Sequence, residues 1–88
     1  MRVVIVGREF SEYDREIREW EREFFQRTGR EVERLNPDSS EGEAFCRARD
    51  IVEYPTVVVE DEVRGAVVQD FRGAPLPAID DIITYLIS

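Results

Sequence analysis

The side chains that could carry covalent chemistry are few in this sequence. Cys46 is the single thiol in 88 residues, all 12 basic residues are arginine, and there is no histidine. A serine such as Ser11 needs a neighbouring base before it can act as a nucleophile, and histidine is both the commonest base and a common metal ligand. One cysteine forms neither an intrachain disulfide nor a cysteine-based zinc site. The composition therefore leaves Cys46 as the one candidate reactive group, and we expect no metal and no other cofactor.

The surroundings of these two residues favour structural roles. Cys46 falls within a predicted short helix, where a small, partly buried packing residue is the commoner reading. A reactive thiolate needs an electropositive niche, and Arg47 and Arg49 are expected on other faces of that helix. Ser11 stands where a helix begins and is more typical of a cap than of a nucleophile. The acidic run 60–62 is read as a solvated loop, although a weak calcium site is the alternative.

Charge and composition exclude several classes of function. The net charge is −8, with 42% hydrophobic and 36% charged residues. An acidic surface without a basic stripe argues against binding nucleic acid or an anionic membrane. No apolar run approaches the roughly 20 residues of a membrane span, and the apolar start of the chain is short and soon followed by acidic residues. We expect a cytoplasmic, monomeric protein with a single domain over residues 1–88.

The first half of the chain alternates strand and helix patterns. Residues 2–6 form a continuous apolar run, typical of a strand buried on both faces. A helix is predicted from Ser11, with Asp14 completing a capping box, and Gly29 ends it. A strand at 31–35 alternates polar and apolar residues, which predicts a position near a sheet edge. The helix buries a stripe at 3.6-residue spacing, which consists of Tyr13, Ile17, Trp20 and Phe24 and is widened by Phe25.

The second half predicts a short helix, a hairpin and a last helix. Ser40 and Glu43 suggest a capping box for a helix through about residue 49, which Gly42 weakens. Residues 56–60 and 66–71 read as hairpin strands joined by a loop in which Gly65 supplies a positive φ. Pro77 suits the first turn of the last helix. The predicted buried residues are Ala44, Phe45 and Ala48 in the short helix, and Ile79, Ile82, Ile83 and Leu86 in the last one.

The element order β-α-β-α-β-β-α, with a proline before the third strand, resembles the thioredoxin fold. The segment 50–56, which ends in Tyr54, Pro55 and Thr56, is similar to the thioredoxin segment that carries a cis-proline. Residues 36–48 and the glycine-terminated strand at 71–73 add to the resemblance, which spans nearly the whole chain. It implies a four-stranded mixed sheet flanked by three helices and a cis bond at Pro55.

The sequence departs from this family at the place where its chemistry resides. Thioredoxins and glutaredoxins open the first helix with Cys-x-x-Cys or Cys-x-x-Ser, and this chain has Ser11, Glu12, Tyr13 and Asp14 there. The family motif needs a thiolate whose pKa is lowered by the helix N-terminus. Without sulfur, disulfide exchange at this slot is excluded. Glutathione transferases hold a thiolate with serine or tyrosine near this point, but they need an all-helical second domain that this sequence lacks.

The resemblance implies a groove between the first helix and the Tyr54-Pro55 corner. We expect a redox-inactive binding module that recognises an extended peptide or a thiol-containing ligand by pairing with the Tyr54 backbone. Arg8 and Arg72 are the predicted contacts to an acidic group. Two alternatives stay open: a glutathione-dependent or monothiol oxidoreductase acting through Cys46, far from this edge, and a ligand-free scaffold, natural or designed. The predicted groove residues are Phe10, Ser11, Glu12, Tyr13, Tyr54, Pro55, Arg72 and Ala74.

Overall fold

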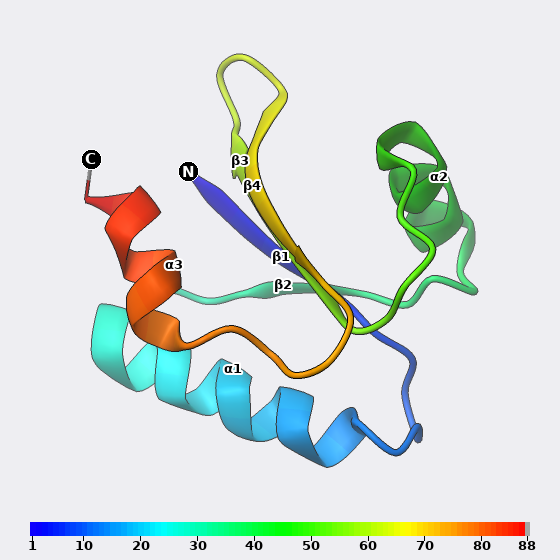
Figure 1. Cartoon of the computed structure of the whole chain (residues 1–88), viewed down its shortest axis with the longest axis horizontal. Coiled ribbons are helices and arrows are strands. Elements are labelled where there is room, and N and C mark those ends of the chain that lie inside the picture. The colour runs from blue at the N-terminus through cyan, green and yellow to red at the C-terminus, as the bar shows by residue number, and fades with distance from the viewer. Residues whose placement is uncertain (88) are drawn as a thin grey trace.

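The computed structural model describes residues 1–87 and places helices on both faces of a four-stranded sheet (Figure 1). The strand order is β2-β1-β3-β4, with β1 parallel to β2 and β3 antiparallel to both neighbours. The predicted α/β mixed sheet is confirmed, and the second strand does lie at an edge. The elements are β1 (Arg2–Val6), α1 (Asp14–Thr28), β2 (Glu33–Leu35), α2 (Ser40–Arg49), β3 (Thr56–Asp61), β4 (Ala66–Arg72) and α3 (Ile79–Leu86).

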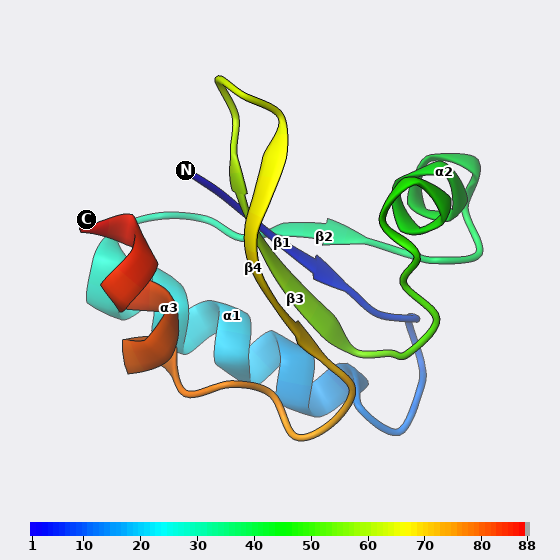
Figure 2. The ribbon, with the colours of Figure 1, turned by 45° about the horizontal axis from the view of Figure 1, so that its top comes forward.

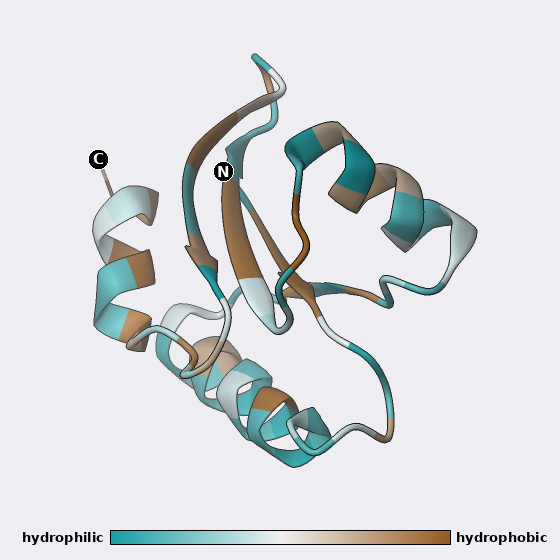
Figure 3. Cartoon of the chain, turned by 45° about the vertical axis from the view of Figure 1, so that its right-hand side comes forward, coloured by the Kyte–Doolittle hydropathy of each residue, from teal (hydrophilic) through white to brown (hydrophobic). Residues whose placement is uncertain are grey.

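The sheet separates two hydrophobic cores. Helices α1 and α3 lie together on one face and α2 lies on the other (Figures 1 and 2). Successive side chains of a strand point to opposite faces, so β1 sends Val3 and Ile5 to the α1 side and Val4 and Val6 to the α2 side. This two-sided burial explains why residues 3–6 of β1 and 57–59 of β3 are apolar without interruption, as the brown parts of these strands in Figure 3 show.

Helix α1 buries the predicted stripe. Ile17, Trp20 and Phe24 are buried, and the rings of Trp20 and Phe24 stack with their centroids 5.4 Å apart. The Trp20 indole N–H donates to the carbonyl of Pro77 at 2.8 Å, which ties α1 to the segment before α3. The predicted contribution of Phe25 is wrong, since its side chain is 50% exposed. One residue advances a helix by about 100°, which turns Phe25 out of the stripe.

The predicted start of α1 was three residues too early. The helix begins at Asp14, and its N-cap is Tyr13, which makes no capping bond through its side chain. The Ser11 hydroxyl instead donates to the Arg8 carbonyl at 3.1 Å and accepts from the Tyr13 N–H at 3.3 Å. Ser11 therefore holds the turn that leads into the helix.

Helix α2 has its predicted length but presents a different face to the sheet. Its N-cap is Ser39, not Ser40, and the Ser39 hydroxyl accepts from the Gly42 N–H at 3.0 Å. Ala44 and Ala48 are exposed, contrary to prediction. The buried residues are Gly42, Phe45 and Cys46, which fall at i, i+3 and i+4 and so share one face.

Helix α3 follows a proline-rich connection. Its N-cap is Ala78, so Pro77 precedes the helix and does not occupy its first turn as predicted. Ile79 and Ile82 are buried, and Ile83 and Leu86 are partly buried against the same core, as expected. Asp80 and Asp81 fall in the first turn. Two peptide bonds are cis, Tyr54-Pro55 and Ala74-Pro75.

The position of Gly42 yields a test of this packing. Replacing glycine by alanine at an exposed helix position normally stabilises the helix by up to about 1 kcal/mol. Here an added Cβ would lie 1.8 Å from the Asn36 carbonyl oxygen. We expect Gly42→Ala to lower the free energy of unfolding by about 1–3 kcal/mol through overpacking, measured by urea denaturation. Glu43→Ala, on the exposed side of the same turn, serves as control, and a stabilised Gly42→Ala protein would contradict the tight α2 contact.

Candidate functional site

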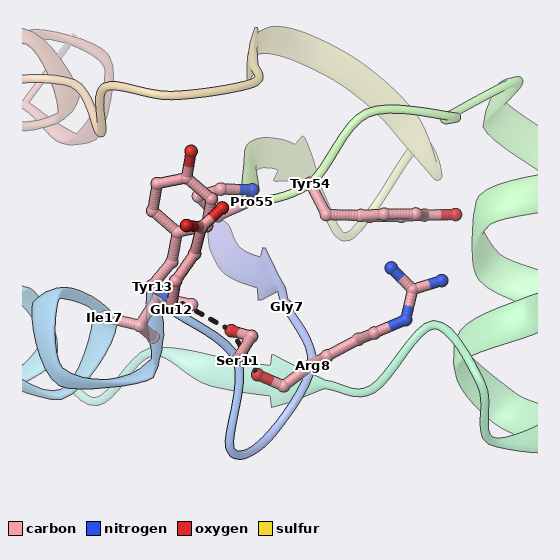
Figure 4. A pocket seen from close by; sticks show the side chains of 8 residues that line it. All are labelled: Gly7, Arg8, Ser11, Glu12, Tyr13, Ile17, Tyr54 and Pro55. Carbon is pink, nitrogen blue, oxygen red and sulfur yellow. Dashed lines mark hydrogen bonds between the residues drawn. The ribbon is translucent and has the colours of Figure 1, made fainter.

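A groove lies between the end of β1, the start of α1 and the Tyr54-Pro55 corner (Figure 4). Its volume is about 250 Å³. Three separate chain segments therefore meet at one side of the sheet, beside the ends of β1 and the start of β3. The lining residues are Gly7, Arg8, Ser11, Glu12, Tyr13, Ile17, Tyr54 and Pro55.

The floor of the groove is apolar and closely packed. Pro55 and Ile17 are fully buried, and Gly7 lies between them. A Cβ on Gly7 would come within 2.6 Å of Ile17 Cδ1 and 3.9 Å of Pro55 Cβ. The lack of a side chain at Gly7 thus lets α1 approach the proline corner. Gly7 and Ile17 are not among the predicted lining residues, because the sequence marks Gly7 only as the residue after an apolar strand and Ile17 only as part of the buried helical stripe.

The two groove tyrosines point in different directions (Figure 4). Tyr13 is half-buried and packs against the α1-side core. The Tyr54 ring packs against the α2-side core, with the Arg8 guanidinium 4.9 Å from its centroid. The Tyr54 hydroxyl is within hydrogen-bonding reach of the Cys46 thiol. Burial is the main cause that raises the pKa of Tyr54. Tyr54 therefore lines the groove while its ring lies on the side away from Tyr13, beside Arg8 (Figure 4).

The slot at the start of α1 carries a fixed negative charge. Asp14 accepts a hydrogen bond from Arg34 at 2.6 Å and lies 3.4 Å from Arg18. The bond from Arg34 is the main cause that lowers the pKa of the Asp14 carboxyl. Asp14 remains anionic well below neutral pH as a result, at a helix end where a negative charge is favoured. Glu12, exposed at the groove, adds a second carboxylate.

Three predicted groove residues do not line the pocket. Phe10 is 93% exposed and has a φ of 58°, in the left-handed region that non-glycine residues rarely adopt. Arg72 donates to the backbone carbonyls of Asp50 at 2.5 Å and Arg49 at 2.9 Å. Ala74 is exposed on the connection after β4.

The two arginines that the sequence suggested as contacts for an acidic ligand have partners within the chain. Arg8 is bonded to Asp38, with Nε 2.8 Å from Oδ2, and this bond is the main cause that raises its pKa. Arg72 lies 3.2 Å from Asp70, and that bond is the main cause of its own raised pKa. Each guanidinium therefore already has a carboxylate partner within the chain.

Cys46 is a packing residue, as the sequence indicates, but its predicted distance from the groove is wrong. Its side chain is 5% exposed and belongs to the α2-side core, where it reaches the Tyr54 hydroxyl. Burial raises the pKa of the Cys46 thiol, while Tyr54 and Arg49 act against that rise. The thiol is therefore protonated and shielded at neutral pH.

The described residues supply no grouping suited to a metal. Within residues 1–87, no set of three or more cysteine, aspartate or glutamate side chains is arranged to hold an ion. Asp61, in the acidic loop considered for calcium, accepts from the backbone N–H groups of Val63 and Arg64. In the same part of the chain, every helix is too short or too polar to cross a membrane.

This arrangement of sheet, helices and proline corner defines a thioredoxin-like fold. Thioredoxin 1 from the thermophilic eubacterium Thermosipho africanus TCF52B is similar to it, with a TM-score of 0.68 over 99% of this chain and 91% of that chain, at 13% identity. A structure described as that of a malarial protein is also similar, with a TM-score of 0.65 over 97% of this chain and 91% of that chain, at 12% identity. No protein-family model and no curated protein matches the sequence. The likeness therefore concerns the fold alone.

The environment of Cys46 yields a second test. We expect the folded chain to react with a disulfide reagent more slowly than the urea-unfolded chain at the same pH, since each unit of raised pKa lowers the thiolate fraction about tenfold. Because the folded pKa exceeds the unfolded one, the contribution of this thiol to stability is full below the unfolded pKa. It is lost as pH rises through the folded value. A native thiol as reactive as the unfolded one would contradict this assignment.

Proposed function

We propose that this protein is a redox-inactive binding module that holds an extended peptide in the groove beside Tyr54 and Pro55. One observation carries the proposal: within residues 1–87 no hydrogen bond reaches the backbone N–H or C=O of Tyr54, which stands over an apolar floor. Unpaired backbone groups next to a sheet are the usual means by which proteins add an extended peptide as a further strand. The groove then selects the side chains that accompany this pairing.

The groove's side chains support the redox-inactive part of this proposal. The Ser11 hydroxyl is engaged in its turn by two hydrogen bonds, and no base of the histidine or lysine kind exists in the sequence. Sulfur chemistry through Cys46 is the competing function. Tyr54 and Arg49 lower the pKa of that thiol, which favours the competitor, but burial outweighs both. A thiol that is 5% exposed also offers an attacking group little access to its sulfur.

Peptide display tests the binding function directly. Pools of randomised extended peptides are screened against the purified chain, and bound pools are mapped by amide chemical shifts at Gly7, Tyr13 and Tyr54. We expect Tyr13→Ala to weaken binding about tenfold, since buried aromatic anchors commonly contribute more than 1 kcal/mol. Phe25→Ala, which removes an exposed aromatic elsewhere on α1, should leave affinity unchanged.

Two outcomes would count against this function. Binding that is equally insensitive to Tyr13→Ala and Phe25→Ala would place the peptide elsewhere. Reduction of insulin disulfides by the purified chain, abolished by Cys46→Ala, would favour the oxidoreductase. If no pool binds, the ligand-free scaffold is the better account of the chain.

The strained Phe10 provides a further prediction. Backbone strain of this kind persists where surrounding structure enforces it and is frequent at binding sites. We expect Phe10→Asn to raise the free energy of unfolding by roughly 0.5–1 kcal/mol, since asparagine tolerates the left-handed region better, and to weaken peptide binding by loss of an exposed aromatic. Urea denaturation and the same binding assay measure the two effects. A variant that is more stable and binds equally well would remove Phe10 from the interface.

A further inference from the structure

The charged side chains around the groove differ in whether they have bonding partners within the chain. Both nearby arginines, Arg8 and Arg72, have carboxylate or carbonyl partners of their own. The carboxylates on the exposed side of α1 differ. Within residues 1–87, Glu12, Glu16 and Glu23 have no ion-pair partner, whereas Glu19 pairs with Arg15 at 3.2 Å. The edge of the groove therefore carries a net negative charge.

These glutamates form one line that leads away from the groove. Glu12, Glu16, Glu19 and Glu23 are spaced 4, 3 and 4 apart in sequence, which keeps the helical members on one face of α1. Glu12 lines the groove itself. The next three line a second hollow of about 430 Å³, whose other walls are Trp20, Pro75 and Leu76. We call this line of four glutamates the acidic stripe.

The second hollow combines an apolar floor with these carboxylates. Trp20 is almost buried and Leu76 packs on the α1-side core, so they form its base. The connection 73–77 runs alongside α1 and forms the opposite wall (Figure 2). From Glu16 to Glu23 the helix rises about 10 Å, a distance that three residues of an extended chain span. A peptide that leaves the groove along α1 would thus pass both of these unpaired carboxylates within about three of its residues.

We propose that the groove and the acidic stripe together bind an extended, basic segment of a partner protein, with apolar side chains in the two hollows and arginine or lysine side chains on the glutamates. This inference rests on the proposed peptide-binding function and names its ligand class. Charge complementarity selects this occupant. An acidic segment would meet the unpaired glutamates while both nearby arginines are engaged. A second copy of this chain would bring another net charge of −8 against the same surface.

The test compares three pools of synthetic peptides of roughly nine residues, which span about 30 Å when extended. Each pool has the same randomised apolar centre, flanked by arginine, serine or glutamate. Binding is measured by fluorescence anisotropy at low salt and at about 0.5 M salt, where the Debye length falls below about 5 Å. The tested variant is Glu16→Gln/Glu23→Gln. Its matched control, Glu31→Gln/Glu41→Gln, changes the net charge by the same two units at exposed glutamates outside α1.

We expect the arginine pool to bind tightest and the glutamate pool weakest. Each removed carboxylate should weaken binding of the arginine pool about threefold. The Glu16→Gln/Glu23→Gln variant should therefore bind this pool about tenfold more weakly than the unchanged chain at low salt, with a much smaller difference at high salt. The control variant should bind the arginine pool with nearly unchanged affinity. An equal loss in both double variants would overturn the proposal in favour of non-specific attraction.

The outcomes also separate this inference from the function on which it rests. Equal binding of the arginine and serine pools, still sensitive to Tyr13→Ala, would retain the groove function and overturn the basic ligand. Tighter binding of the glutamate pool would likewise retain the groove function and overturn the basic ligand. If none of the three pools binds, both the groove function and the basic ligand fail.

Discussion

The close contact of Gly7, Ile17 and Pro55 governs both the core and the groove. Gly7 is the residue after β1, Ile17 comes from the second turn of α1, and Pro55 immediately precedes β3. The contact is possible because Gly7 has no Cβ, which would come within 2.6 Å of Ile17. The start of α1 can then lie beside the proline corner, and the space above this contact is the groove. The floor of the site is therefore also part of the main core, so its shape is as rigid as the packing beneath it.

Regular patterns in the sequence predicted the fold because its core follows regular periods. Ile17, Trp20 and Phe24 were found from helical spacing, and β1 from its continuous apolar run. Helix starts were less predictable because neighbouring polar residues compete for one capping position. Ser39 was preferred over Ser40 in this way, while Ser11 served its own turn. Short-range patterns cannot decide between such neighbours, since the choice depends on how the preceding turn is packed.

The candidate site was only partly visible in the sequence, because its electrostatics depend on long-range pairs. Arg8 lies 30 residues from its partner Asp38, and Arg72 lies 22 residues from the Asp50 carbonyl that it binds. No local pattern reveals such pairs, so both arginines were read as available to a ligand. The same principle operates on the α2 face, where Glu60 is 3% exposed and bonds to Arg2 and Arg49. Arg49 also lies over the Phe45 ring at 3.7 Å. Much of the arginine charge thus stabilises the fold internally, and the surface is left acidic.

The start of α1 lacks both sulfur and the electrostatic surroundings that would activate it. A reactive thiolate requires neighbouring positive charge or free amide groups to lower its pKa. Here the N–H of Tyr13 donates to the Ser11 hydroxyl, and Asp14 is held as an anion by Arg34. Ser11 itself lies before the helix, outside the first turn where the dipole is strongest. A thiol in this place would lie before the helix and three residues from an anionic carboxylate, so the arrangement supplies little to lower its pKa. What lies at this place is a hollow with an apolar floor and with unpaired backbone at its edge, the two features on which the proposed peptide binding rests.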